Sequence, residues 1–348
     1  MGEPDGESAA DARKKLSDLV FGAMAAHVVG LATRLRLADA IGDRERSADD
    51  LAAEYGLPPA TVHRVLRALA ALEVLTENSP GRFSLAPAGT LLRSDSADSV
   101  YALTRAFTDP VMLRAWERLD HSVETGRTAF DEVFGTDFFD HLKGEPELSA
   151  LFNAAMSQAT RRAAAVLPDA YDFGRFHTVM DIGGGDGTLL REILRRHSGL
   201  RGIVFDSEAG AAQAGDTFAA AGIADRCTVA TGDFFESVPE GADLHVVKSV
   251  LHDWDDRRSA QILRHCRWAL PDHGRLLAIE PVLPDVVDST ISSRIYLSDL
   301  NMLVNVGGLE RTRDDFARLF HNAGFTLISA FPLPAGTGFW TLEAAPTT

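Results

Sequence analysis

Short apolar runs alternate with amphipathic stretches through the C-terminal half of the chain. Two amphipathic stretches carry apolar residues at helical spacing and predict helices, at 189–196 and 255–270. Five apolar runs predict buried strands: 178–182, 202–206, 227–233, 244–250 and 275–282. Strands that alternate with helices indicate an α/β fold with a parallel sheet. Two further runs close the chain and predict an antiparallel hairpin at the edge of a mixed seven-stranded sheet: 325–333 and 339–343.

The N-terminal third of the chain has a different pattern, which is dominated by helical spacing. Residues 16–42 predict one or two helices, and Ser47 is placed to cap a short helix. A second helix begins at Pro59 and carries a stripe that is expected to be buried: Val62, Val65, Leu66, Leu69 and Leu72. Apolar segments on both sides of the turn 78–81 predict a hairpin. Two helices followed by a hairpin indicate a winged helix-turn-helix, and 100–170 predicts further helices.

A glycine-rich turn follows the first predicted strand of the C-terminal half. The order of strand, glycine turn and helix forms a nucleotide-type pocket, because glycine lets the backbone turn tightly and approach a ligand closely. Asp181, just before the turn, would repel a pyrophosphate but attracts the ammonium and sulfonium of S-adenosylmethionine (SAM). The dinucleotide pattern also lacks its third glycine, since Thr188 stands there. The alternative is a glycine turn that binds no ligand.

Acids recur at the ends of the predicted strands. Asp206 ends the second strand and Asp233 follows the third. Because ligands of open α/β sheets bind at the carboxyl ends of the strands, these carboxylates and Asp181 are expected to meet at one crevice. There Asp206 suits both ribose hydroxyls of a nucleoside, and Asp233 suits the adenine amino group. Each acid taken alone is more often a helix cap or a turn residue, but the repetition favours a shared crevice.

Several longer motifs continue this pattern in order: DIGGGDG, FD, GDFF, VVKSVLHDWDD, IEPVLPD and GGLERT. With these motifs, the chain resembles the small-molecule O-methyltransferases of plant phenolic and bacterial antibiotic pathways over most of its length. The resemblance implies a Rossmann-like SAM-binding domain with a mixed seven-stranded sheet, and an N-terminal, all-helical winged-helix domain that forms a homodimer. The composition of residues 1–12 predicts a disordered tail. Three parts are expected to follow: the dimerisation domain (13–105), a helical connector lining the substrate pocket (106–170) and the catalytic domain (171–348).

The resemblance also implies roles for single residues. SAM, with S-adenosylhomocysteine as its product, would contact eight of them: Asp181, Gly183, Gly185, Asp206, Asp233, Phe234, Lys248 and Trp254. His252 matches the catalytic base, Glu280 and Glu310 match the acids that flank it, and Asp253 is a further candidate. The acceptor pocket is expected to draw on apolar and amide side chains: Phe107, Met112, Trp116, Phe152, Met156, Asn301, Met302 and Asn305. For most large apolar residues of 100–170, packing in the core is the commoner role.

The expected chemistry explains why a histidine is needed. A phenol has a pKa of about 10, so at neutral pH it needs a base as its oxygen attacks the methyl group. Histidine has a pKa of about 6.5, and His252 lies just beyond the fourth strand. A neighbouring acid would orient the ring and stabilise the imidazolium. Glu280 and Glu310 suit this role, or each is a structural acid paired with an arginine such as Arg311.

Charge limits the partners of this protein. A formal net charge of −16 argues against nucleic acid or an anionic membrane as the main partner. The winged-helix pattern raises DNA binding as a rival function. However, residues 1–100 hold 11 Lys and Arg against 15 Asp and Glu, whereas a DNA-binding domain needs a basic face. No apolar run is expected to reach the length of a membrane span.

The remaining composition predicts a reduced, self-associating protein. Cys227 and Cys266 fall in a predicted strand and helix, which favours two free thiols in a cytoplasmic protein. No cluster has metal-ligand spacing, so no metal is expected. Apolar residues on more than one face of 16–42 and 59–72 predict a homodimer. The expected reaction is methylation of a phenolic hydroxyl on a small secondary metabolite. A SAM-dependent hydroxylation, decarboxylation or pericyclic reaction stays open, and the acceptor itself is not readable from the sequence.

Overall fold

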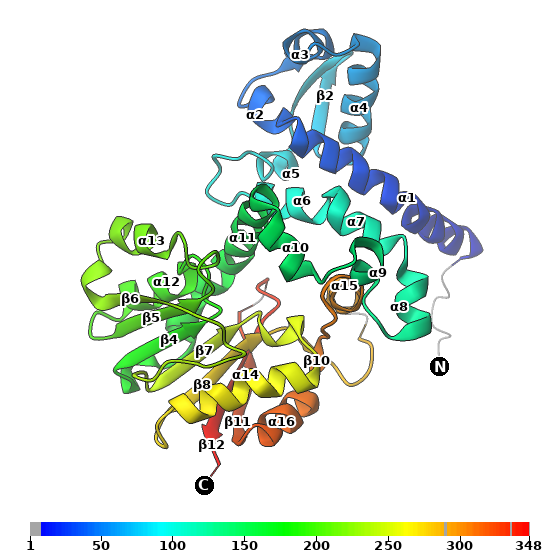
Figure 1. Ribbon diagram of the computed structural model, residues 1–348. Helices are drawn as coiled ribbons and strands as arrows, with labels where there is room; N and C mark the ends of the chain where they lie inside the picture. The colour runs from blue at the N-terminus through cyan, green and yellow to red at the C-terminus, as the bar shows by residue number, and fades with distance from the viewer. Residues whose placement is uncertain (1–7, 289–290, 335, 348) are drawn as a thin grey trace, which may run out of the picture. The chain divides into compact units, whose positions relative to one another are not determined.

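The computed structural model describes residues 8–288, 291–334 and 336–347, and the chain divides into two compact units, Met1–Leu113 and Arg114–Thr348 (Figure 1). The N-terminal unit is mainly helical: α1 (Ala9–Arg34), α2 (Leu37–Ile41), α3 (Ala48–Tyr55), α4 (Pro59–Ala71), α5 (Pro87–Thr90) and α6 (Tyr101–Phe107). Its three strands form an antiparallel sheet in the order β1-β3-β2: β1 (Arg46–Ser47), β2 (Leu75–Ser79) and β3 (Arg82–Leu85). The description of this domain as all-helical is therefore too strict. The expected hairpin is present as β2 and β3.

Local signals set the bounds of α3 and α4. Ser47 Oγ accepts a hydrogen bond of 3.0 Å from Asp50 N and caps α3, and Gly56 ends α3 with a φ of +63°. Proline at the first position starts α4. Most of the predicted stripe on α4 is buried, but Leu72 is 41% exposed. The prediction for Leu72 is wrong because this residue caps the C-terminus of α4, where the chain leaves the helical face that packs on the core.

Helix α1 begins earlier than expected. The Ser8 side chain caps it by accepting a hydrogen bond from Asp11 N, so residues 8–12 are not a disordered tail. Residues 1–7, the rest of that predicted tail, lie outside the described residues. The first two-thirds of α1 present five large apolar side chains that are each more than half exposed: Leu16, Leu19, Val20, Phe21 and Met24.

The length of α1 also corrects the expectation about membrane spans. Within the described residues, α1 is one helix of 26 residues that is long and apolar enough to cross a membrane by length and composition. This test is weak evidence, because soluble proteins contain such helices too. The exposed apolar face of α1 nevertheless needs a partner.

Helix α7 (Pro110–Trp116) crosses the boundary between the units, and the C-terminal unit continues with four helices: α8 (Leu119–Thr125), α9 (Ala129–Phe134), α10 (Phe138–Gly144) and α11 (Pro146–Ala170). These helices confirm the helical character predicted for this stretch. Seven strands then form one mixed sheet in the order β11-β12-β8-β7-β4-β5-β6: β4 (Thr178–Ile182), β5 (Arg201–Asp206), β6 (Cys227–Thr231), β7 (Leu244–Lys248), β8 (Arg275–Glu280), β11 (Phe325–Pro332) and β12 (Trp340–Pro346).

The pairing of the strands confirms the predicted mixed sheet. Strands β4 to β8 pair in parallel, whereas β12 pairs antiparallel with β8 and β11 pairs antiparallel with β12 at the edge. The main helices between the strands are α12 (Thr188–Arg196), α13 (Ala214–Ala220), α14 (Asp256–Ala269) and α16 (Arg313–Asn322). A short parallel pair, β9 (Val282–Leu283) and β10 (Arg311–Thr312), lies outside the main sheet.

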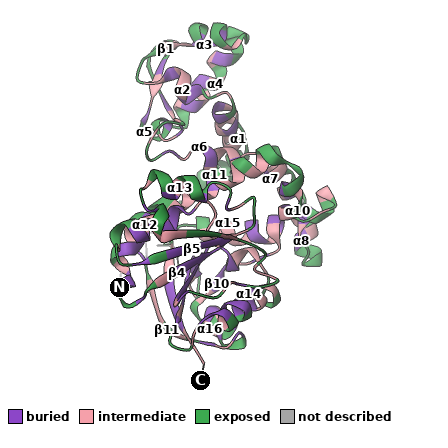
Figure 2. Ribbon diagram, turned by 60° about the vertical axis from the view of Figure 1, so that its left-hand side comes forward, coloured by how far each residue is buried: buried purple, intermediate pink, exposed green. Residues whose placement is uncertain are grey.

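The sheet is covered on both faces, and its central strands are buried (Figure 2). Successive side chains of β7 alternate between the two cores: Leu244 and Val246 pack with residues of α11 and α12, and Val247 packs with residues of α14 and α16. All five residues of β7 are buried, the polar His245 and Lys248 among them, as expected for a strand that is covered on both faces. The parallel strands also bring Asp206, Lys248 and Glu280 to the same carboxyl edge of the sheet.

Candidate active site

The glycine turn between β4 and α12 needs its glycines for two reasons. Gly183, Gly185 and Gly187 have φ angles of +70°, +56° and +76°, a region that other residues rarely adopt. A Cβ atom on Gly184 would lie 2.8 Å from Asp181 Oδ2. The turn is therefore wrapped closely around the Asp181 carboxyl group.

Asp181 is a buried acid without a hydrogen-bond donor on one oxygen. The residue is 2% exposed, and Oδ2 has no partner among the described residues. Burial raises the pKa of Asp181 to about 7, although the Lys248 ammonium opposes this rise. Burial lowers the pKa of Lys248 to about 8, while Nζ contacts Ser249 Oγ at 2.9 Å. An orphaned carboxylate beside a glycine turn fits a cationic or N–H-bearing ligand such as the amino-acid portion of SAM.

Asp206 is held against the same turn. Its Oδ2 accepts a hydrogen bond of 2.9 Å from Gly185 N, and Oδ1 accepts one of 2.7 Å from Ser207 N. Burial raises the pKa of Asp206, and these backbone N–H groups oppose that effect. Asp233 is exposed and accepts a hydrogen bond of 2.7 Å from Phe235 N. The structure thus brings Asp206 to the glycine turn and gives Asp233 a turn-forming contact, while their roles toward ribose and adenine stay predictions.

Aromatic side chains gather around Trp254. Its ring stacks on Phe139 of α10, with centroids 5.1 Å apart, and meets Phe235 edge-on at 4.8 Å. The Arg258 guanidinium lies 4.2 Å from the Trp254 ring. Phe152 of α11 contacts Phe138 at 5.1 Å. This cluster forms an aromatic wall built from α10, α11 and the segment after β7, which suits the adenine position expected for Trp254.

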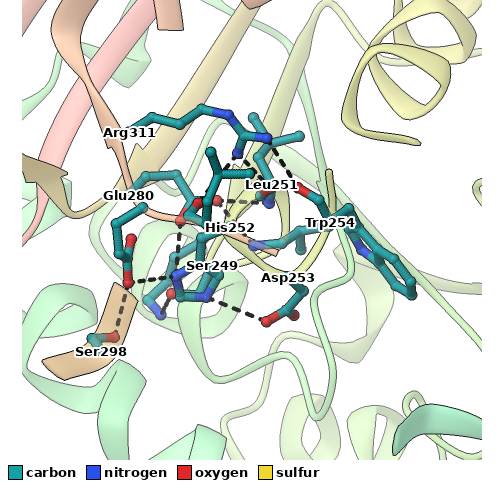
Figure 3. A network of polar contacts seen from close by, with 12 residues as sticks. Ser249, Leu251, His252, Asp253, Trp254, Glu280, Ser298 and Arg311 are labelled. Carbon is teal, nitrogen blue, oxygen red and sulfur yellow. Dashed lines mark hydrogen bonds and ion pairs between the residues drawn. The ribbon is translucent and has the colours of Figure 1, made fainter. Parts of the chain in front are cut away.

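A short turn after β7 carries His252, and Glu280 holds its start (Figure 3). The turn, η3, spans Leu251–Asp253 and follows Ser249, whose φ of +52° is unusual for a residue with a side chain. The fully buried Glu280 accepts hydrogen bonds from Val250 N at 3.0 Å and Leu251 N at 2.9 Å through the same oxygen. One glutamate therefore fixes the backbone on which His252 sits.

The His252 ring lies among three carboxylates. Nδ1 is 3.2 Å from Glu310 Oε1 and 3.7 Å from Glu280 Oε2, and Nε2 is 3.6 Å from Asp253 Oδ1 (Figure 3). Burial disfavours the charged ring, but Glu280, Glu310 and Asp253 together outweigh it and raise the pKa of His252 to about 10. Because two glutamates face Nδ1, the neutral ring is expected to keep its proton on this nitrogen, so Nε2, which has Asp253 beside it, is the nitrogen that gives up and takes a proton. The four predicted catalytic side chains thus meet at one point.

Two residues that the sequence did not identify support Glu310. Ser298 Oγ donates a hydrogen bond of 2.8 Å to Glu310 Oε1, the oxygen that His252 also contacts. Glu310 N donates to Asp299 Oδ1 at 2.8 Å. Both residues belong to α15 (Arg294–Asn301). Glu310 is therefore clamped by α15 and is not the partner of Arg311.

Arg311, which the sequence offered only as a partner for the glutamates, instead holds the turn of His252. It is 1% exposed and donates hydrogen bonds to Leu251 O at 2.7 Å and Trp254 O at 2.9 Å, on either side of His252 (Figure 3). A further bond of 2.9 Å joins Nε to Asp256 Oδ1 at the start of α14. The sequence signal that could have pointed to this role is the position of Arg311 next to Glu310 in the GGLERT motif. Arg311 fixes the shape of the turn that presents His252.

Replacing Gly308 by alanine is expected to displace His252. A Cβ atom on Gly308 would lie 1.9 Å from His252 O, because Leu309 N donates a hydrogen bond of 2.9 Å to that same oxygen. The clash is with backbone, so the turn must move, at a cost in stability of about 1–3 kcal/mol. Thermal unfolding should show this loss, and the turnover of SAM should fall with it.

Gly215→Ala is the matched control for this substitution, because a Cβ atom there meets nothing within 4 Å. Normal stability and turnover in Gly308→Ala would contradict the tight packing of this loop on the turn.

The residues predicted to line the acceptor pocket fall into separate groups. Trp116 Nε1 donates a hydrogen bond of 3.1 Å to Asn301 Oδ1, and Asn305 Nδ2 donates one of 2.9 Å to the same oxygen. Met302 and Asn305 lie in a π-helical turn, η4 (Met302–Val306), that continues α15 and packs against η3. The others lie on α11 (Phe152 and Met156) or in the N-terminal unit (Phe107 and Met112). Their contact with an acceptor stays a prediction.

Among the described residues, His, Cys, Asp and Glu form no group of metal-binding geometry.

Comparison with known proteins agrees with this architecture. An O-methyltransferase domain model matches residues 116–326, and an O-methyltransferase dimerisation domain model matches residues 17–95. The chain is 48% identical over 337 residues to an O-demethylpuromycin-O-methyltransferase of Streptomyces alboniger, covering 96% of this chain and 89% of that protein. It is 41% identical over 331 residues to the phenazine O-methyltransferase PhzM of Lysobacter antibioticus, covering 95% of each.

A solved structure that shares this architecture contains both kinds of ligand expected here. It is the O-methyltransferase NcsB1 from neocarzinostatin biosynthesis, in complex with SAM and 2-hydroxy-5-methyl naphthoic acid. It matches with a TM-score of 0.79 and 32% identity, over 92% of this chain and 96% of that one.

Proposed function

The chain belongs to the O-methyltransferase family and uses SAM as its methyl donor, and we propose that it methylates a phenolic hydroxyl of a small aromatic molecule in natural-product biosynthesis, with His252 as the general base. The observation that carries this proposal is the position of the His252 ring, which has two glutamates on Nδ1 and Asp253 beside Nε2, so that Nε2 of the neutral ring can accept a substrate proton. Aromatic acceptors are also named for the relatives.

The residues divide the work between holding SAM and activating the acceptor. Asp181 and Asp206 would hold SAM at the glycine turn, with Lys248 beside them. When bound, SAM would supply a methyl group attached to a sulfonium, and the sulfur is a good leaving group. In the neutral form of the ring, His252 Nε2 takes the proton of the phenolic hydroxyl as the phenolic oxygen becomes nucleophilic. Glu310 and Glu280 keep the proton on Nδ1 and stabilise the imidazolium that forms, as the acid of a catalytic triad does.

Product analysis tests this function directly. Purified protein with SAM and a panel of aromatic hydroxyl compounds should form S-adenosylhomocysteine and a methyl ether in equal amounts. Mass spectrometry of both products distinguishes methyl transfer from a reaction that uses SAM without transferring its methyl. Consumption of an acceptor without S-adenosylhomocysteine would overturn the proposal.

Replacing Asp181 by asparagine is expected to weaken SAM binding by about 1.5–3 kcal/mol, the usual contribution of a hydrogen bond to a charged group. Because the pKa of Asp181 is raised to about 7, the carboxyl group binds a proton below this pH and must lose it to attract a cation. The affinity of the parent protein for SAM should therefore increase from pH 5.5 to 7.5, whereas that of Asp181→Asn should stay nearly constant. Calorimetry across this range measures both, and a parallel pH dependence of the two proteins would contradict the assignment.

The exposed apolar residues of α1 are expected to form a homodimer interface. The dimerisation domain match includes this helix from residue 17 onward, and obligate homodimers bury well over 2,000 Å² of largely apolar surface. Placing charges in that face by Leu19→Asp with Met24→Asp should convert a dimer into a monomer, as sedimentation at micromolar concentration would show. Arg13→Asp on the same helix is a control. A parent protein that sediments as a monomer would refute the dimer.

The two free thiols favour a cytoplasmic location.

A further inference from the structure

Trp116, Asn301 and Asn305 form a hydrogen-bonded chain that the mechanism above does not use. Asn301 and Ser298 are three residues apart on α15 and share one face of that helix. Ser298 Oγ contacts Glu310, and Glu310 contacts His252 Nδ1. The face of α15 that carries Ser298 therefore reaches, through Glu310, the Nδ1 side of His252, and Asn301 lies about one helical turn further along this face.

Trp116 fixes which end of each amide points in which direction. The two ends of an asparagine amide have the same shape, but one end only accepts hydrogen bonds and the other only donates them. An indole N–H only donates, so the Asn301 atom 3.1 Å from Trp116 Nε1 is the oxygen. That oxygen also faces Asn305 at 2.9 Å, so Asn305 presents its NH2 group there. The free end of Asn301 is consequently its NH2 group.

The two free amide ends differ in access. Asn305 is fully buried, and its Oδ1 is enclosed without a partner among the described residues. Asn301 keeps 8% of its surface exposed, and within the described part of the chain its Nδ2 has no protein acceptor. The accessible group of this hydrogen-bonded set is therefore the Asn301 NH2, a donor. Its orientation is fixed by the two hydrogen bonds that Asn301 Oδ1 accepts on the other side of the amide.

We propose that the hydrogen bonds among Trp116, Asn301 and Asn305 fix the orientation of the Asn301 amide, so that its NH2 group donates a hydrogen bond to the bound acceptor molecule. We call this set of three residues the polarity relay. The enzyme then selects aromatic hydroxyl compounds that also carry a hydrogen-bond acceptor, such as a carbonyl oxygen or a ring nitrogen. A ring N–H at that place would face another donor, and both would lose their bonds to water. The inference rests on the proposed methylation of an aromatic hydroxyl and adds the chemistry of a second group on the same substrate.

Three bicyclic phenols of similar size test the relay. A hydroxyquinoline carries a ring nitrogen that accepts, a hydroxyindole carries a ring N–H that donates, and a naphthol has neither. The kcat/KM of the best positional isomer of each is measured at saturating SAM. We expect the parent enzyme to prefer the hydroxyquinoline over the other two by about tenfold.

Asn301→Asp inverts the polarity without changing the shape. One carboxylate oxygen still accepts from Trp116 and Asn305, while the other replaces the free NH2 group with an acceptor. The ratio of kcat/KM for hydroxyquinoline to that for hydroxyindole should fall at least about tenfold. A new charge near His252 affects all three substrates alike, so it cancels in this ratio. Trp116→Phe removes the donor that orients the amides and should bring the ratio toward one.

Asn322→Asp, at an exposed position of α16, is the matched control and should leave the ratio unchanged. An unchanged ratio in Asn301→Asp, with all three phenols still methylated, overturns the relay and leaves the proposed function intact. A parent enzyme that forms no S-adenosylhomocysteine with any phenol overturns the proposed function and the relay with it.

Discussion

Replacing His252 by alanine is expected to slow methyl transfer by about 10²–10⁴-fold, the usual contribution of a positioned general base. The affinity for SAM should stay nearly unchanged, because the carboxylates at the glycine turn, Asp181 and Asp206, remain in place. The loss should therefore appear in kcat, measured as S-adenosylhomocysteine formed per enzyme at saturating SAM. Removal of the ring also leaves the buried carboxylates of Glu280 and Glu310 without their cation, so unfolding should be measured alongside.

Two comparisons make the result for His252→Ala decisive. His273→Ala removes an exposed histidine of the same domain and should behave as the parent enzyme does. An acceptor with an electron-withdrawing substituent ionises at lower pH and needs a base less, so the variant should lose less activity with it than with a simple phenol. If His252→Ala retained more than about a tenth of the parent rate on a simple phenol, catalysis would rest on alignment of the reactants alone.

The fold was predictable where its signals are local. The apolar runs of β4, β5 and β7, the glycine turn, and the Ser47 cap of α3 each depend on residues close together in sequence. Leu72 was placed wrongly because helical spacing does not tell where a helix ends relative to the core.

The contacts around His252 were less predictable because they join distant segments. His252, Glu280 and Glu310 were identified from their motifs, but their distances follow from the alignment of β7 and β8 and from a loop 58 residues beyond His252. Ser298 and Asp299 belong to none of the motifs, and Arg311, although it lies in GGLERT, had no assigned contact with the turn that carries His252. The pKa of His252 is raised because three carboxylates from three segments outweigh the opposing effect of burial, and no single stretch of sequence contains these groups.

Glu310→Gln is expected to reduce kcat/KM by about 10²-fold or more at high pH, where the His252 ring is neutral in both proteins, for a reason that concerns the His252 tautomer. The Glu310 carboxylate accepts from Nδ1 and so keeps the proton on that nitrogen, 3.2 Å away. A glutamine amide can present N–H at the same place, which favours the proton on Nε2 and blocks the nitrogen that must accept from the substrate. Glu280 Oε2, at 3.7 Å from Nδ1, limits the loss because it can still hold part of the population in the correct tautomer.

The pH dependence of Glu310→Gln gives a result that lost folding alone would not produce. In the parent enzyme the pKa of His252 is raised to about 10, so kcat/KM should keep rising with pH well above 7 as Nε2 loses its proton. Removing one of the carboxylates that raise this pKa lowers it, so the rise in the variant should occur at lower pH. Ser298→Ala is the matched control, because it removes a hydrogen bond of 2.8 Å to the same Glu310 oxygen and leaves the charge in place. The pH profile of kcat/KM should be measured with two acceptors whose hydroxyl groups differ in pKa. The part of the profile that reflects ionisation of the acceptor shifts between the two, whereas the part that reflects His252 does not. A profile for Glu310→Gln that coincides with that of the parent would show that Glu310 does not act through His252.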